Sequence, residues 1–98
     1  MAKYLMLWKF NRNLIPVTPQ ERVKSYSALM KFIQQDIERG IIKDWGCFVG
    51  ESNGYSVVEG SEVDLCKMVQ RYSPFCGFTT HPIASVDQMN EVIKAIAG

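Results

Sequence analysis

The segment Lys3–Phe10 is the feature of the sequence that most limits how this chain can fold. It is too short for an independent helix, and the turn-forming run Asn11–Asn13 ends it, so the pattern predicts a strand. Successive strand side chains point to opposite faces. The two sets are Tyr4, Met6, Trp8 and Phe10 on one side, and Leu5 and Leu7 on the other. Because both sets are apolar, we expect a central strand in a sheet covered on both faces.

Three helices are each marked at their start by a residue that can cap the helix. Thr18, Ser61 and Ser85 each precede a stretch in which apolar residues recur every three or four positions. Pro19 suits the first turn of the first helix, and Gly40 predicts the end of that helix. We expect the apolar stripes to face the core. They are Val23, Tyr26, Met30, Ile33 and Ile37, then Leu65, Val69 and Tyr72, then Val86, Met89, Ile93 and Ile96.

The remaining segments have the character of strands. Ile41–Val49 and Tyr55–Glu59 flank the pair Asn53-Gly54, which tolerates positive φ and predicts a tight turn between antiparallel strands. Phe75–Ile83 predicts the last strand. Pro82 places that strand at a sheet edge, because proline cannot donate a ladder hydrogen bond.

The order of elements is strand, helix, strand, strand, helix, strand, helix. It predicts an α+β fold of the ferredoxin-like β-α-β-β-α-β type, with a four-stranded antiparallel sheet and an extra C-terminal helix. The 98 residues fit one domain spanning 1–98. We expect the first two helices to cover one sheet face. We expect the third to cover part of the other face, and a second copy of the chain to cover the rest.

Composition excludes several classes of protein. The net charge of +1, from 11 basic and 10 acidic residues, argues against a nucleic-acid partner. No apolar run is long enough for a membrane span or a secretory leader, so we expect a cytoplasmic protein. Cys47, Cys66 and Cys76 lack metal-site spacing, and His81 is the single histidine. We therefore expect reduced, largely buried thiols, no metal and no cofactor.

Three segments carry a resemblance to a known family. Lys3–Phe10, Gly54–Glu59 and the ending Phe78–Ile83 resemble a small, functionally uncharacterised bacterial and archaeal family. Such proteins are similar to the dimeric α+β barrel superfamily, which includes cofactor-free monooxygenases, muconolactone isomerases, haem-dependent chlorite-degrading enzymes and ligand-sensing regulatory domains. The resemblance implies the fold and a homodimer. It transfers no catalytic residue, because the fold alone does not select among these chemistries.

The candidate site rests on aromatic residues. Trp8 and Trp45 lie on expected strands and Tyr26 on the first helix, where they could line a cleft for a planar or apolar molecule, or could be plain core aromatics. His81 is the candidate for proton transfer, with a surface position as the alternative. Asp44 and Glu59 on the hairpin strands could form a carboxylate pair, or could be exposed or salt-bridged to Lys43 or Arg71.

Two hypotheses of function follow, from different classes. The first is a homodimer that binds a small apolar or aromatic molecule or serves as an interaction module. The second is a cofactor-independent enzyme of monooxygenase or isomerase type. The sequence favours the first, because no convergent set of titratable groups is visible.

Overall fold

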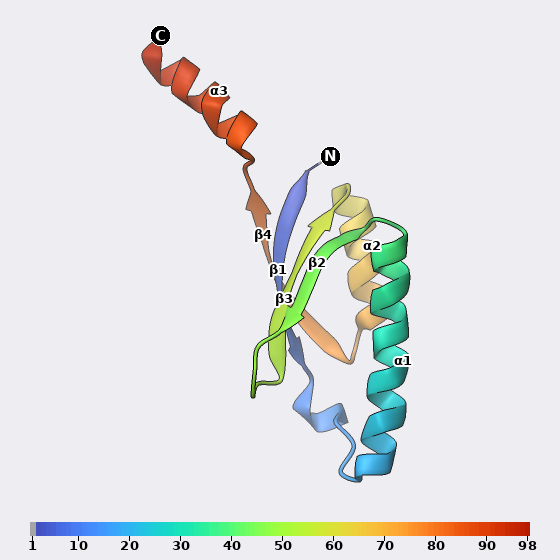
Figure 1. Ribbon diagram of the computed structural model, residues 1–98. Helices are drawn as coiled ribbons and strands as arrows, with labels where there is room; N and C mark the ends of the chain where they lie inside the picture. The colour runs from blue at the N-terminus through green and yellow to red at the C-terminus, as the bar shows by residue number, and fades with distance from the viewer. Residues whose placement is uncertain (1) are drawn as a thin grey trace.

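The structure is a computed structural model that describes residues 2–98 (Figure 1). The elements along the chain are β1 (Lys3–Phe10), a short 3-10 helix (Arg12–Leu14), α1 (Pro19–Glu38), β2 (Ile42–Cys47), β3 (Asn53–Glu59), α2 (Glu62–Tyr72), β4 (Cys76–Ile83) and α3 (Val86–Ala97). The four strands form one antiparallel sheet in the order β2-β3-β1-β4. The predicted ferredoxin-like topology is therefore confirmed, with β1 central and β4 at an edge.

All three predicted helix caps are present. Thr18 Oγ1 accepts a hydrogen bond from the Glu21 backbone N–H at 3.3 Å. Ser61 and Ser85 each form a reciprocal capping box with the residue three positions on. Gly40, with φ of 78°, follows the end of α1, where a residue with a Cβ would be strained.

The core lies between the sheet and the two helices α1 and α2, which cover the same face (Figure 1). Strand alternation turns Tyr4, Met6, Trp8 and Phe10 towards these helices. The structure thereby decides which side of β1 meets the helices. The buried cluster consists of Met6, Ile33, Ile42, Val58, Leu65, Met68, Tyr72 and Cys76.

Helix α1 packs against the sheet mainly through its C-terminal half. Of the stripe predicted for it, only Ile33 is buried, whereas Val23 and Ile37 are exposed. The prediction that the whole stripe faces the core is therefore wrong. No side chain in the first half of the helix, residues 19–28, is buried.

The predicted tight turn at Asn53-Gly54 is also wrong. Both residues lie inside β3, and the turn is made by residues 48–52, where Gly50 has φ of 78°. Gly54 is a glycine for another reason. A Cβ on it would overlap the backbone oxygen of Gly46 and the ring of Trp8.

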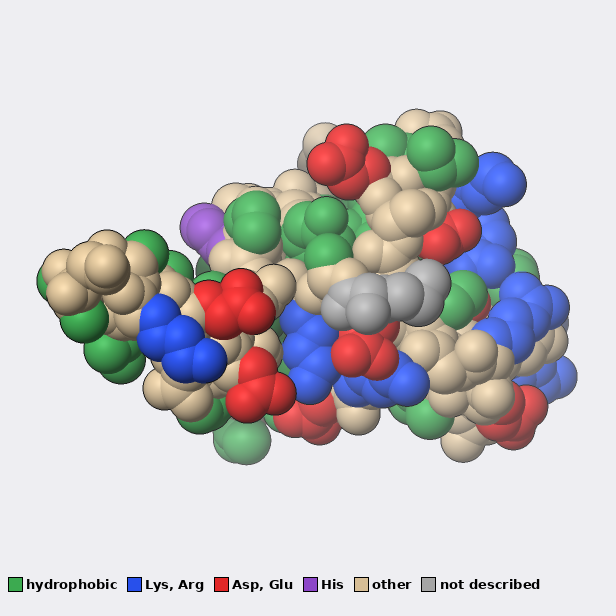
Figure 2. All heavy atoms as spheres, turned by 90° about the horizontal axis from the view of Figure 1, so that it is seen from above, with side chains coloured by type: hydrophobic (Ala, Val, Ile, Leu, Met, Phe, Trp, Pro, Cys, Tyr) green, Lys and Arg blue, Asp and Glu red, His purple; other side chains and the backbone are tan. Residues whose placement is uncertain are grey.

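Helix α3 does not cover the second sheet face as expected. It projects away from the body as an arm that continues the direction of β4, and every residue in it is exposed (Figures 1 and 2). The extents of 61 × 26 × 18 Å reflect this arm. The second face, here called the open face, thus carries no helix. Its apolar side chains are Leu5, Leu7, Tyr55, Val57 and Ile83.

Candidate functional site

A cavity of about 350 Å³ lies between α1 and the helix side of the sheet. On α1 it is bounded by the middle of the helix, between Tyr26 and Ile33. Helix α2 contributes Met68 and Tyr72 to the cavity wall. The other walls are Tyr26, Leu29, Met30 and Ile33 of α1; Trp8 and Phe10 of β1; Ile42, Trp45 and Cys47 of β2; Glu51, Ser52 and Ser56 of the β2–β3 hairpin; and Cys76 and Phe78 of β4.

Two stacked aromatic pairs form much of the wall. The rings of Trp8 and Trp45 are nearly parallel, with centroids 5.4 Å apart and an interplanar angle of 6°. Phe10 and Tyr26 stack in the same way, at 5.5 Å and 8°. The structure thus brings the three sequence-predicted residues Trp8, Tyr26 and Trp45 to one cavity. Stacked pairs of this kind present broad, flat and weakly polar surfaces.

Gly54 is what allows Trp8 to lie against the sheet. It is the register partner of Trp8 on β3 and leaves room where a side chain would stand. The indole N–H of Trp8 donates to the backbone oxygen of Tyr55 at 3.1 Å. Trp8 therefore offers a guest its ring face and no free donor.

A buried polar network fixes α1 against α2 beside the cavity. Asp36 of α1 is almost fully buried, and its carboxylate accepts hydrogen bonds from Arg71 and, at 2.7 Å, from the Tyr72 hydroxyl. Burial, reinforced by the bond to Asp36, raises the pKa of Tyr72 above its usual value. The network pairs a buried charge with a cation and a donor, as burial requires.

The cavity wall also contains two thiols and the Ser56 hydroxyl, which differ in their hydrogen-bond partners and burial. The Cys47 thiol is within 3.7 Å of three backbone oxygens, those of Phe48, Glu51 and Asn53. Burial raises the pKa of the Cys76 thiol to about 11, so this thiol is neutral near pH 7. The Ser56 hydroxyl is buried and, within residues 2–98, is the one buried side-chain polar atom that lacks a hydrogen-bond partner.

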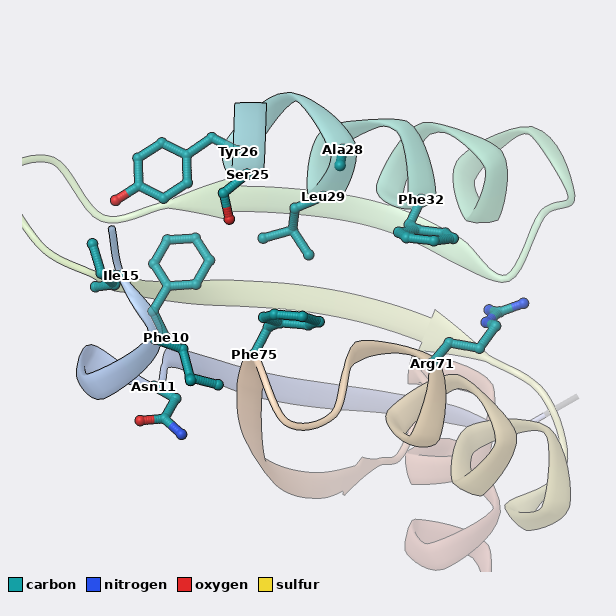
Figure 3. A pocket seen from close by; sticks show the side chains of 11 residues that line it. Phe10, Asn11, Ile15, Ser25, Tyr26, Ala28, Leu29, Phe32, Arg71 and Phe75 are labelled. Atoms are coloured by element: carbon teal, nitrogen blue, oxygen red, sulfur yellow. The ribbon is translucent and has the colours of Figure 1, made fainter. Parts of the chain in front are cut away.

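A second cavity of about 250 Å³ adjoins the first and shares Phe10, Tyr26 and Leu29 with it. Figure 3 shows Tyr26, Leu29 and Phe32 reaching from α1 towards Phe10 and Phe75. Arg71 lies at one end of this space (Figure 3). The stacked pair Phe10–Tyr26 therefore stands between two apolar spaces.

His81 lies apart from both cavities. It is exposed on β4, opposite Leu5 in the register, and this position turns it towards the open face. Its role as a proton-transfer group stays a prediction. On the hairpin, Asp44 accepts a hydrogen bond from the Tyr55 hydroxyl at 2.8 Å, which raises the pKa of Tyr55. Glu59 pairs with Lys43 at 3.3 Å. Neither Asp44 nor Glu59 lines the cavity.

The cysteines are less buried than expected. Cys76 is buried, but Cys47 and Cys66 are exposed, and all three are free thiols. Cys66 lies on α2 outside its buried face, which Leu65, Met68 and Tyr72 form. That their thiols are reduced in the cell stays a prediction.

One family profile matches residues 2–97, nearly the whole chain, and its description is Domain of unknown function (DUF3303). The chain belongs to this family. Comparison of the DUF3303 chain with curated proteins gives no match. Across the part of the chain that the structure describes, no helix is long and apolar enough to cross a membrane. Nor do three His, Cys, Asp or Glu side chains gather there as metal ligands would.

Sequence reasoning missed three residues that shape this site in the DUF3303 chain. Ser56 lies in an alternating strand, where its inward position could have been read from the pattern of Gly54 and Val58. Asp36 is the one buried charged residue of its helix, and no local signal marks its burial. Gly54 was interpreted as a turn residue because Asn-Gly is the commonest signal for one.

Proposed function

We propose that this chain is a homodimeric module that binds a small, planar, largely apolar molecule in the cavity between α1 and the sheet. The observation that carries the proposal is the pair of parallel aromatic stacks in the cavity wall. Binding sites for small molecules are typically apolar, aromatic-lined and about 300–1,000 Å³ in volume, with few polar groups. The larger cavity matches that description.

The size of the cavity supports a guest. Protein interiors pack to the density of organic crystals, and voids larger than a water molecule are few. Beside the space of about 350 Å³, the lining residues Phe10, Tyr26 and Trp45 are only partly covered by the rest of the chain. A flat apolar guest would restore those contacts and remove the surface from water.

Nuclear magnetic resonance of the two indole N–H groups tests the binding proposal directly. The chain has two tryptophans, and both line the cavity. A bound aromatic fragment should therefore shift both indole signals. Trp45→Ala should weaken binding by about fivefold or more, because one stacking surface is lost. Phe48→Ala is the matched control, since Phe48 stacks with Tyr55 away from the cavity lining.

Shifts confined to the β2–β3 turn around Gly50, with both indole signals unmoved, would contradict the cavity as the site. His81→Ala separates binding from catalysis. It should leave fragment affinity unchanged, because His81 does not line the cavity. Loss of a catalysed turnover on this substitution would instead support the enzyme alternative.

The homodimer rests on a separate observation, the exposed apolar surface of the open face and of α3. Leu7 is 38% exposed, and Met89, Ile93 and Ile96 on α3 are between 48% and 80% exposed. A helix of 12 residues is marginal in water by itself, so α3 needs a packing partner. A second copy offers one, and an interface of about 1,600 Å² would be of ordinary size for a stable complex. The same features favour membership of the dimeric α+β barrel superfamily.

Sedimentation equilibrium tests the dimer. Leu7→Glu and Ile93→Glu should each shift a dimer towards monomer, because they place a charge in an apolar interface. Val23→Glu is the control, since Val23 is an apolar, exposed residue on α1, away from the open face. A wild-type monomer at micromolar concentration would contradict the dimer proposal.

A cytoplasmic location is inferred as well, and the two exposed free thiols support a reducing compartment.

A further inference from the structure

The Ser56 hydroxyl is the starting point, because it is polar, buried and unpartnered. Ser56 is 2% exposed and lies on β3 between Met6 of β1 and Trp45 of β2 in the register. Its neighbours Gly54 and Val58 share its face of the sheet, so its side chain turns towards α1 and lines the larger cavity. Leaving such a group without a partner costs about 1–3 kcal/mol, and native proteins rarely accept this without a reason.

Two other buried polar groups of the same cavity already have partners. The Trp8 indole N–H donates to Tyr55, and the Tyr72 hydroxyl donates to Asp36. The Cys76 thiol is a weak donor that burial keeps neutral. Among the buried side chains of the cavity, Ser56 therefore offers a guest the one unoccupied strong hydrogen-bonding group, whereas the Tyr26 hydroxyl and the Trp45 indole N–H belong to less buried side chains.

The charges around the cavity favour a neutral guest. Glu51 is the ionisable carboxylate in the wall, and it lies exposed at the hairpin, so an anion would meet a like charge. No lysine or arginine lines this cavity, and the nearest guanidinium, that of Arg71, is paired with Asp36. An ionic group carried into such apolar walls would lose its hydration without compensation.

We propose that Ser56 is the polar anchor of the site, and that the ligand class is a neutral one- or two-ring aromatic molecule with a single hydroxyl or carbonyl group that hydrogen-bonds the Ser56 hydroxyl. This inference deepens the proposed function and rests on it. The rings stack on the aromatic walls, while the polar group reaches the floor of the cavity at β3. The hydroxyl of serine serves either partner, since it can donate to a carbonyl or accept from a phenol.

Three probes share one naphthalene ring system and differ in their polar group: 2-naphthol, naphthalene and 2-naphthoate. They separate the contributions of stacking, of a neutral hydrogen-bonding group and of charge to the affinity. Dissociation constants are measured from the indole N–H shifts of the full chain and of two variants, Ser56→Ala and Ser27→Ala. Wild type should bind 2-naphthol most tightly and 2-naphthoate least. Ser56→Ala should weaken 2-naphthol by about threefold to tenfold, the value of one hydrogen bond, and leave naphthalene within about twofold of wild type. Ser27→Ala, at an exposed position of α1 that lines neither cavity, should change neither affinity.

The melting temperature of the unliganded protein gives a second measurement. Ser56→Ala should raise it, because the variant removes an unpartnered buried hydroxyl. If Ser56→Ala leaves the preference for 2-naphthol over naphthalene unchanged, the anchor is overturned while the cavity remains a binding site. If Ser56→Ala lowers the melting temperature, the hydroxyl is held by an ordered water and the anchor is overturned as well. If none of the probes moves the indole signals of the wild type, the proposed function itself fails.

Discussion

Met6 and Leu7 are neighbours on β1, yet Met6 is completely buried and Leu7 is 38% exposed. The difference reflects the two faces of one sheet. On the helix side, α1 and α2 supply side chains that fill most of the space between layers. On the open face, side chains of similar character have no covering element from their own chain. An apolar pattern therefore predicts that a surface is buried, but it does not say which element or partner covers that surface.

Helices α2 and α3 repeat the contrast. Both begin with a serine capping box, and both carry apolar residues at helical spacing. Yet Leu65, Met68 and Tyr72 of α2 are buried, whereas no residue of α3 is. Because the caps and stripes are equivalent, the difference arises from the connection. The strand β4 leads α3 away from the body, whereas the path after β3 returns α2 to the sheet (Figure 1).

A large loss of stability is expected on the helix side, at the Asp36–Arg71 pair. Arg71→Ala should lower the free energy of unfolding by about 3 kcal/mol, because it leaves the buried Asp36 carboxylate without its cation. Chemical denaturation measures the change. Adding Asp36→Asn to this variant should recover part of the loss, since the buried charge is then gone. Lys31→Ala, an exposed change on α1, serves as the control, and an equal effect there would contradict the argument.

Substitution of the two neighbours on β1 sharpens the comparison of faces. Met6→Ala should cost about 2–5 kcal/mol at any protein concentration, since it opens a hole in the core. Leu7→Ala should cost no more than about 1 kcal/mol at dilutions where the chain is monomeric. Its cost should grow at high concentration, where a second copy covers the open face. A cost for Leu7→Ala that is independent of concentration would count against the dimer.

The next largest loss of stability is expected from substitution of a strand glycine, and two such glycines can be compared. Gly54→Ala should cost about 1–3 kcal/mol, because its Cβ would overlap the Gly46 backbone and the Trp8 ring. Gly77→Ala on β4 should be nearly neutral, since nothing lies within 4 Å of the added Cβ. Thermal unfolding of the two variants compares them. Similar losses at both positions would mean that strand glycines matter here for their backbone alone.

The smallest effects concern the thiols. A thiol reagent at pH 8 should label Cys47 and Cys66 quickly and Cys76 slowly, because burial keeps Cys76 protonated and covered. Its pKa is raised from 9.0 to about 11, so the folded state holds this proton more tightly than the unfolded chain. The resulting stabilisation is present below about pH 9 and is lost as pH rises through 11. Cys76→Ala should flatten that part of the stability curve, and an unchanged curve would refute the assignment.

Local chemistry determined much of this structure from the sequence alone. The caps Thr18, Ser61 and Ser85, the end of α1 at Gly40 and the strand period of Lys3–Phe10 act within a few residues, so the order of elements and the sheet topology could be predicted. The aromatic set Trp8, Tyr26 and Trp45 could be named as well. Their types suit a cavity wall, whatever the details of packing.

Only the tertiary structure decided the rest, because the deciding contacts join residues far apart in the chain. Asp36 is buried because Arg71 and Tyr72 of α2 meet it. Gly54 makes room for the ring of Trp8 across the sheet, and it does not form a turn. Strand alternation is symmetric, so the sequence could not say which side of β1 the helices cover, and that choice placed Trp8 and Ser56 at the cavity and His81 on the open face. The position of α3 depended on the direction of β4, which no stripe of apolar residues encodes.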